Sequence, residues 1–192
     1  MKDHKILLVG VGGQGTILAS RILSWIALQQ GKSIKMSEIH GMAQRGGTVT
    51  TQVCIADKVF SPVIEPGEAD ILLSFELLEA LRNLHYLRGD GLLLVNNLRI
   101  MPMSVITGEE VYPPEIEITL GTSRANLHII SASEKAYELG NPRVANVIML
   151  GALSKYLTDI ELSVWHQALD ECVPPRHIEL NRLAFDAGLR LG

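Results

Sequence analysis

Lys5-Ile-Leu-Leu-Val9, followed directly by Gly10-Val-Gly-Gly-Gln-Gly15-Thr16, is the stretch that decides the fold of this chain. Its apolar run, bounded by glycines, predicts a buried parallel strand. Apolar residues at helical spacing come next and predict a helix over residues 16–30. A strand, a glycine-rich turn and a helix in this order form the first half of a β-α-β unit. The turn leaves the first amides of the helix uncovered, which favours an anionic group there.

The composition limits the class of protein. The chain has 192 residues, of which 47% are hydrophobic and 20% charged, so it can bury a substantial core in one domain. A net charge of −4 argues against a general binder of nucleic acids or membrane surfaces. No apolar run approaches the roughly 20 residues of a membrane helix. We therefore expect neither nucleic acid nor a membrane as a partner.

The two cysteines, Cys54 and Cys172, lie far apart in the sequence. They offer neither a disulfide framework nor a set of four metal ligands, and the histidines are scattered without metal-ligand spacing. No serine-centred nucleophile motif is present either. We expect a reduced cytoplasmic protein without catalytic or metal-binding residues of its own.

Strands and helices alternate along the rest of the chain. The expected strands cover residues 32–37, 48–55, 59–61, 70–74, 92–95, 116–120 and 127–131, with a turn at 89–91. The expected helices cover residues 75–87, 133–139 (capped by Ser133), 141–156, 160–171 and 176–190. This pattern predicts an α/β fold with a doubly wound Rossmann-like sheet, mostly parallel, and a helical C-terminal extension. A single domain over residues 1–192 is expected, with the helices of about 142–190 packed on it.

The glycine-rich turn has the spacing of the dinucleotide fingerprint, Gly-x-Gly-x-x-Gly. That fingerprint also requires an acidic residue at the end of the second strand, and Glu38 falls just beyond the expected end, so the match is incomplete. Three interpretations stay open: binding of a dinucleotide, binding of another phosphate-bearing group, and a purely structural turn. The candidate binding residues are Gly10, Gly12, Gly13, Gln14, Gly15 and Thr16.

A second glycine-rich stretch, Glu38-Ile-His-Gly-Met-Ala-Gln-Arg-Gly-Gly47, is expected to form a polar loop at the carboxyl edge of the sheet. Arg45 is suited to clamp a phosphate or carboxylate, and His40 to act as an acid, a base or a hydrogen-bond donor. Docking on another subunit is the alternative role of the loop. For Asn146, close helix packing and a ligand contact both stay open. The candidates here are Glu38, His40, Gly41, Gln44, Arg45, Gly46, Gly47 and Asn146.

Together with Asp70-Ile-Leu-Leu-Ser-Phe-Glu76 and Leu139-Gly-Asn-Pro-Arg-Val-Ala-Asn146, these two stretches resemble the gamma-type domain of 2-oxoacid:ferredoxin oxidoreductases. The resemblance extends over roughly residues 4–190. The form of the second stretch is closest to that of the small (beta) subunits in the indolepyruvate branch of the family.

The resemblance implies a non-catalytic small subunit of a complex that converts an aryl 2-oxoacid such as indolepyruvate, with coenzyme A, to an acyl-CoA and carbon dioxide. Ferredoxin takes up the electrons through the complex. In that family thiamine diphosphate, magnesium and [4Fe-4S] clusters reside in the large subunit, which agrees with two isolated cysteines here. The resemblance allows coenzyme A at the turn Gly12–Thr16 and at Arg45. The alternative is a stand-alone Rossmann-like protein that binds a nucleotide or coenzyme A.

Overall fold

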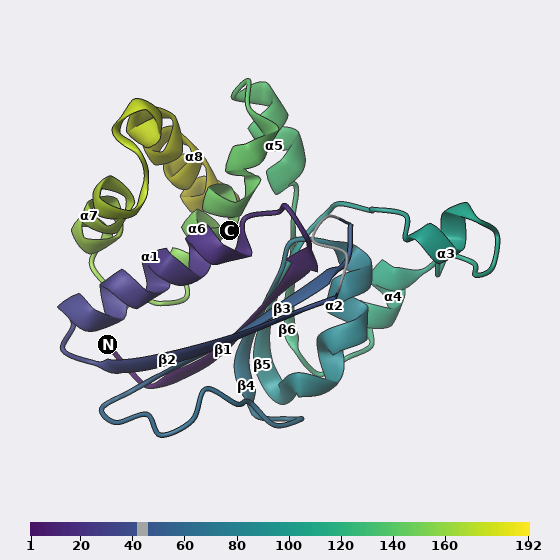
Figure 1. Cartoon of the computed structure of the whole chain (residues 1–192), viewed down its shortest axis with the longest axis horizontal. Helices are drawn as coiled ribbons and strands as arrows, with labels where there is room; N and C mark the ends of the chain where they lie inside the picture. Colours follow the sequence, from purple (N-terminus) through teal and green to yellow (C-terminus); the bar gives the residue numbers. More distant parts are fainter. Residues whose placement is uncertain (42–45) are drawn as a thin grey trace.

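The structure, a computed structural model, describes residues 1–41 and 46–192. A six-stranded sheet with the order β2-β3-β1-β4-β5-β6 forms its centre (Figure 1). Strand β3 is antiparallel to both of its neighbours, and the other pairs are parallel. The prediction of a mostly parallel sheet is therefore confirmed. The strands are β1 (His4–Val11), β2 (Ser33–His40), β3 (Thr48–Ala56), β4 (Ala69–Ser74), β5 (Leu87–Asn96) and β6 (Asn126–Ile130).

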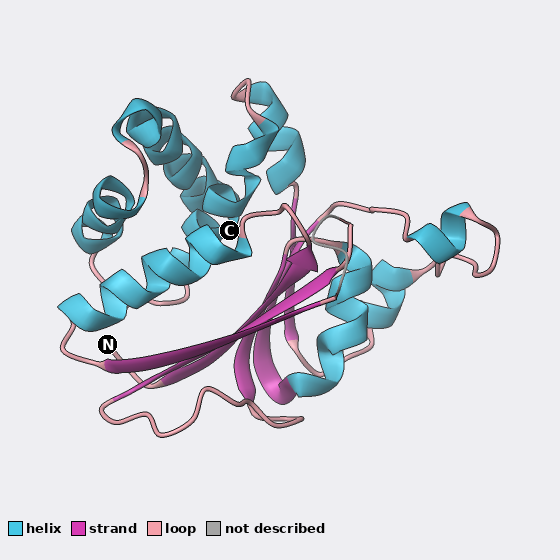
Figure 2. Cartoon of the chain, viewed as in Figure 1, coloured by secondary structure: helices cyan, strands magenta, loops and turns pink. Residues whose placement is uncertain are grey.

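Helices cover both faces of the sheet (Figure 2). One face carries α1 (Thr16–Gln29), α5 (Ala132–Glu138), α6 (Ala145–Ser154), α7 (Leu162–Cys172) and α8 (Ile178–Leu191). The other face carries α2 (Leu77–Asn83) and α4 (Ile116–Gly121), with the short α3 (Met103–Ile106) beyond them. Three 3-10 turns complete the elements: η1 (Leu84–Tyr86), η2 (Pro142–Val144) and η3 (Pro175–His177).

Strand β1 is buried on both faces, which explains its uninterrupted apolar sequence. Ile6 and Leu8 point into the core beneath α1 and α5–α8, whereas Leu7 and Val9 point into the core beneath α2 and α4. The α/β fold with its C-terminal helices is as predicted. Among the described residues, none of the helices combines the length and apolar character that crossing a membrane requires.

Three predicted elements are wrong. Residues 59–61 form no strand, since Pro62 follows and removes a backbone donor. Residues 89–91 are not a turn but continue β5, whose pairing with β4 shifts register beside them. Residues 116–120 are helix α4 instead of a strand, because Ile116 and Leu120, four residues apart, supply its buried face.

Helix ends also differ from the predictions. Glu76 caps α2, which starts at Leu77 and gives way to η1. The N-cap of α5 is Ser131, not Ser133, and the predicted helix over 141–156 begins as η2 before α6. Asn141 caps that turn, since its Oδ1 accepts from the Arg143 amide at 3.0 Å.

The segment between β5 and α4, residues 97–115, extends away from the body with α3 on it (Figure 1); we call it the arm. Its exposed apolar side chains are Met101, Met103, Ile106 and Val111. The buried carboxylate of Glu76 holds the base of the arm, because its Oε1 accepts from the Ile100 amide at 3.0 Å and from the Tyr112 hydroxyl at 2.9 Å. The arm is thus firmly anchored although it leaves the core.

Helices α6 and α8 touch through their backbones. A Cβ built on Gly151 would lie 2.0 Å from the Phe185 carbonyl oxygen, and one on Gly188 would lie 1.9 Å from that of Ile148. Neither backbone can yield as a flexible side chain would. The two glycines therefore fix how the C-terminal helices pack onto the core.

We expect Gly151→Ala to lower the free energy of unfolding by roughly 3 kcal/mol, because the added methyl group forces the two helices apart. Urea unfolding followed by circular dichroism measures the change. Gly121→Ala at the end of α4 is the matched control, since a Cβ there meets no atom within 4 Å. Equal stabilities of the two variants would contradict the direct backbone contact.

Candidate functional site

The turn between β1 and α1 is strained in a way that only glycine tolerates. Gly13 has a φ of 103° and Gly15 a φ of 82°, values that L side chains adopt at a cost. Gly10 lies earlier, inside β1, where an added Cβ would approach Gln14 Oε1 to 2.7 Å and the Phe75 side chain to 3.2 Å. The predicted glycine positions therefore serve the tight turn and the close approach of its neighbours.

The Gln14 side chain braces the turn from within the chain. Its Oε1 accepts from the Val11 amide at 2.6 Å, and its Nε2 donates to the Phe75 carbonyl oxygen at 2.9 Å. Both polar atoms are thus engaged, and they tie the end of β1 to the end of β4.

Asn146 braces the same turn from α6. It is 4% exposed, and its Nδ2 donates to the Gly15 carbonyl oxygen at 3.1 Å. A Cβ on Gly15 would lie 2.3 Å from that nitrogen. The turn therefore has the C-terminal helices directly against it.

Glu38 and His40 lie inside strand β2, which corrects the prediction of a loop starting at Glu38. The ladder with β3 continues to the pair His40–Val49, because backbone pairing across the hairpin outweighs the polar composition. Glu38 lies opposite Thr51, whose hydroxyl donates to Glu38 Oε2 at 3.2 Å. The His40 ring Nδ1 lies 3.0 Å from the Gly41 carbonyl oxygen.

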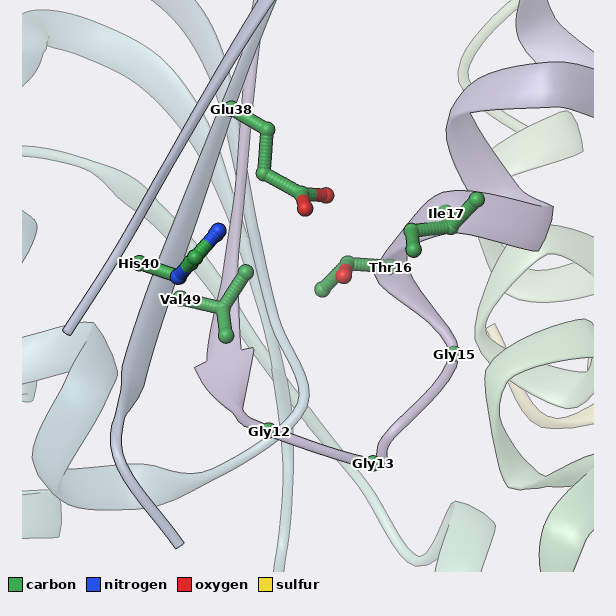
Figure 3. A pocket seen from close by; sticks show the side chains of 8 residues that line it. All are labelled: Gly12, Gly13, Gly15, Thr16, Ile17, Glu38, His40 and Val49. Atoms are coloured by element: carbon green, nitrogen blue, oxygen red, sulfur yellow. The ribbon is translucent and has the colours of Figure 1, made fainter. Parts of the chain in front are cut away.

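A pocket of about 420 Å³ brings the two glycine-rich stretches together (Figure 3). Glu38 and His40 extend from β2 toward the space in front of α1. The stretches are also joined directly, since the Gly12 amide donates to the Gly47 carbonyl oxygen at 2.8 Å. The lining residues are Gly12, Gly13, Gly15, Thr16, Ile17, Glu38, His40 and Val49. We call this space the Glu38 pocket.

The two walls of the Glu38 pocket differ in chemistry. On one side α1 begins at Thr16, and its N-cap Gly15 has no side chain to cap it, so the first amides and the positive end of the helix dipole favour acceptor atoms of a ligand. On the other side stand a carboxylate and an imidazole. The pocket is therefore suited to a ligand with acceptor atoms at one end and hydroxyl or amine donors at the other.

The remaining predicted residues surround the hairpin loop. Gly41 donates its amide to the Thr48 carbonyl oxygen at 3.3 Å, and Gly46 has a φ of 79°. Gln44 and Arg45 lie outside the described residues. Among the described residues, no three His, Cys, Asp or Glu side chains are placed to hold a metal ion.

Comparisons with known proteins place this chain in a family. The sequence model described as pyruvate ferredoxin/flavodoxin oxidoreductase matches residues 5–191. The chain belongs to this family. It is 36% identical over 195 residues to the indolepyruvate oxidoreductase subunit IorB of Pyrococcus horikoshii, covering 99% of this chain and 96% of the relative. The IorB subunit of Thermococcus kodakarensis is 34% identical over 197 residues, with the same coverage.

A solved structure supports the same assignment. The gamma subunit of a keto/oxoacid ferredoxin oxidoreductase from Geobacter sulfurreducens PCA superimposes with a TM-score of 0.73 at 26% identity, covering 97% of this chain and 96% of that one. These relatives are subunits of oxidoreductases, and the resemblance inferred from the glycine-rich stretches is confirmed.

The sequence alone assigned no role to Glu76, although this residue ends the stretch Asp70-Ile-Leu-Leu-Ser-Phe-Glu76. The residue is 1% exposed, and its Oε2 accepts from the Glu79 amide at 2.9 Å while its Oε1 holds the arm. The available signal was an acceptor side chain directly before a helix. Burial, and then the hydrogen bond to Glu76, raises the pKa of the Tyr112 hydroxyl, which therefore stays a donor.

Glu79 is a second buried carboxylate that the sequence did not reveal. Its Oε1 accepts from Arg82 Nη1 at 2.7 Å and from the Thr48 hydroxyl at 3.2 Å, whereas Oε2 has no partner among the described residues. Burial raises the pKa of this carboxyl, against the opposing effect of Arg82. Glu79 thus links α2 to Thr48, the first residue of β3. Burial makes the charged form of this carboxyl less favourable.

We expect Gly15→Ala to lower the free energy of unfolding by roughly 3 kcal/mol, from the left-handed backbone and the collision with Asn146 together. Gly13→Ala is the control: its φ is also positive, but a Cβ there meets nothing within 4 Å, so about 1 kcal/mol is expected from the backbone alone. Urea unfolding measures both. Equal losses would show that Asn146 does not press on Gly15.

The raised pKa of Glu79 predicts a pH dependence of stability. Between the unfolded value near 4.5 and the higher folded value, the folded state binds more protons, so stability falls as the pH rises through that interval. We expect the stability of the wild type relative to Glu79→Gln to decrease from pH 4.5 upward, as measured by urea unfolding at several pH values.

Glu117→Gln provides a control of opposite sign. The Arg99 guanidinium lowers the pKa of Glu117, so its contribution is lost as the pH falls through the folded value, below 4.5. A pH-independent difference between the wild type and Glu79→Gln would contradict the role of burial at Glu79.

Proposed function

We propose that this chain is the non-catalytic small subunit of an indolepyruvate or aryl 2-oxoacid:ferredoxin oxidoreductase in the cytoplasm. In this role it assists the oxidative decarboxylation that yields an acyl-CoA. The observation that carries the proposal is the 34–36% identity to IorB subunits over 96% of their length. Thiamine diphosphate, magnesium and [4Fe-4S] clusters then belong to the large subunit. Cys54 of this chain is buried, and Cys172 is half-buried.

The part of the reaction that we assign to this chain is contact with coenzyme A. Coenzyme A supplies the thiol that accepts the acyl group. The first amides of α1, which have no side-chain cap among the described residues, suit acceptor oxygens of coenzyme A, and the Glu38 carboxylate suits a hydroxyl donor. This chain's residues bind and orient, and the chemical steps take place on the partner.

The strand order favours this assignment over a dinucleotide-binding enzyme. In the dinucleotide fold β2 lies next to β1, and its acidic residue reaches the ribose of a cofactor on the glycine-rich turn. Here β3 lies between β1 and β2, so Glu38 stands one strand farther away.

The arm supports contact with a large subunit. Ile106 and Val111 are 65% and 87% exposed on a segment that is anchored at its base. Clustered exposed apolar side chains mark protein interfaces. The arm leaves the sheet at the carboxyl edge, the edge that also carries the glycine-rich turn, so a partner docked there lies close to the candidate site.

Reconstitution with the large subunit from the same organism tests the proposal. We expect reduction of a viologen dye by indolepyruvate to require both subunits and coenzyme A, and to fall at least tenfold when this chain is omitted. Full activity of the large subunit alone, or no activity of the pair, would refute the role of this chain.

Co-purification tests the partner surface in the same system. We expect the double variant Ile106→Ser, Val111→Ser to be retained less by the tagged large subunit, while Leu28→Ser, at a 61% exposed position on α1, is retained as the wild type is. Equal retention of all three proteins would place the interface elsewhere.

A further inference from the structure

A second cavity lies on the other flank of the glycine-rich turn. It has a volume of about 240 Å³ and is bounded by the turn, the ends of β4 and β5, and the start of the C-terminal helices. In the sheet, β3 and β2 lie on one side of β1, whereas β4 and β5 lie on the other side. The cavity therefore opens at the carboxyl edge where the strand order reverses, which is where open α/β sheets bind ligands.

The charge of this cavity is opposite to that of the Glu38 pocket. Arg143 is the one charged side chain among the described residues that line it. Within the described part of the chain, its guanidinium takes part in no ion pair and donates no hydrogen bond. A phosphate group beside Glu38 is repelled by the carboxylate, whereas a guanidinium binds it with two parallel hydrogen bonds.

Buried amides hold two further donors at this cavity. Asn96, which is 2% exposed, donates from Nδ2 to the Ser133 hydroxyl oxygen at 2.8 Å and accepts from the Ser133 amide at 3.1 Å. The Ser133 oxygen is thus an acceptor, and its own hydrogen has no acceptor among the described residues. Asn146 donates one Nδ2 hydrogen to the Gly15 carbonyl oxygen. Its second Nδ2 hydrogen has no acceptor in the described part of the chain.

The two spaces meet at Gly13, which lines both of them. A Cβ built on Gly13 would find no atom within 4 Å. The surface of the turn is therefore open at this residue, and a ligand can lie across it with one end on each flank.

We propose that the cavity lined by Gly13, Ser133 and Arg143 is an anion subsite that takes a phosphate group of the ligand. The hydroxyl-bearing part of the same ligand crosses Gly13 into the Glu38 pocket. The identity of the ligand as coenzyme A rests on the proposed function. The chemistry of the subsite, in which a guanidinium and two neutral donors bind a phosphate ester, does not depend on it.

Titration calorimetry on the full chain tests the subsite, with coenzyme A and inorganic pyrophosphate as probes. We expect Arg143→Ala to weaken the binding of both roughly ten- to a hundredfold, the range for loss of a charge-assisted contact. Ser133→Ala should weaken binding less, since a neutral donor is lost. Arg124→Ala is the matched control, because Arg124 is an exposed arginine away from both spaces.

The outcomes separate this inference from the proposed function. If Arg143→Ala binds both probes as the wild type does, or if the wild type binds neither, the subsite is refuted. If the wild type binds pyrophosphate in an Arg143-dependent way but does not bind coenzyme A, the subsite stands and the coenzyme A part of the proposed function fails. Equal losses in Arg143→Ala and Arg124→Ala would reduce the effect to net charge and refute the subsite.

Discussion

The carboxyl edge of the sheet depends on the hydrogen bonds that one atom accepts. This atom is the carbonyl oxygen of Phe75, directly after β4. It accepts from Gln14 Nε2 at 2.9 Å and from Asn96 Nδ2 at 3.0 Å, so both of its lone pairs are used. The Phe75 amide in turn donates to the Val9 carbonyl oxygen. One residue, Phe75, thus joins the ends of β1, β4 and β5, and Glu76 next to it adds the arm. Buried acceptors of this kind are costly to leave unpaired, which makes the junction rigid.

This junction gives two flanks of one turn different chemistry. Gln14 and Asn96 both lie at the cavity of Arg143, where their side chains hold the backbone and Ser133 in place. The Glu38 pocket is built differently, from the start of α1 and from the hairpin of β2 and β3. Because β3 is inserted between β1 and β2, the acidic residue and the guanidinium stand on opposite sides of Gly13. The topology therefore separates a donor-rich flank from an acidic one.

The elements predicted well are those whose signal is local. A buried strand bounded by glycines and a helix with period 3.6 identify β1 and α1 by themselves. The positions of Glu38 and His40 were missed because strand pairing across a hairpin is a property of two segments, and the polar letters of β2 suggest a loop. Residues 116–120 alternate enough to suggest a strand, and only packing of Ile116 and Leu120 selects the helix. Arg143 and Ser133 line the same cavity as the turn, and this proximity comes from tertiary packing that no local pattern reports.

The same reasoning distinguishes polar side chains that hold the fold from those that face a ligand. The amides of Gln14 and Asn96 and the carboxylate of Glu76 are buried or half-buried, and their contacts lie within the chain. A mutation there changes the shape of the edge before it changes any binding contact. The Arg143 guanidinium and the uncapped start of α1 have donors left over after the described contacts are counted. We therefore propose that these groups, rather than the glycines between them, are what the site uses to recognise its ligand.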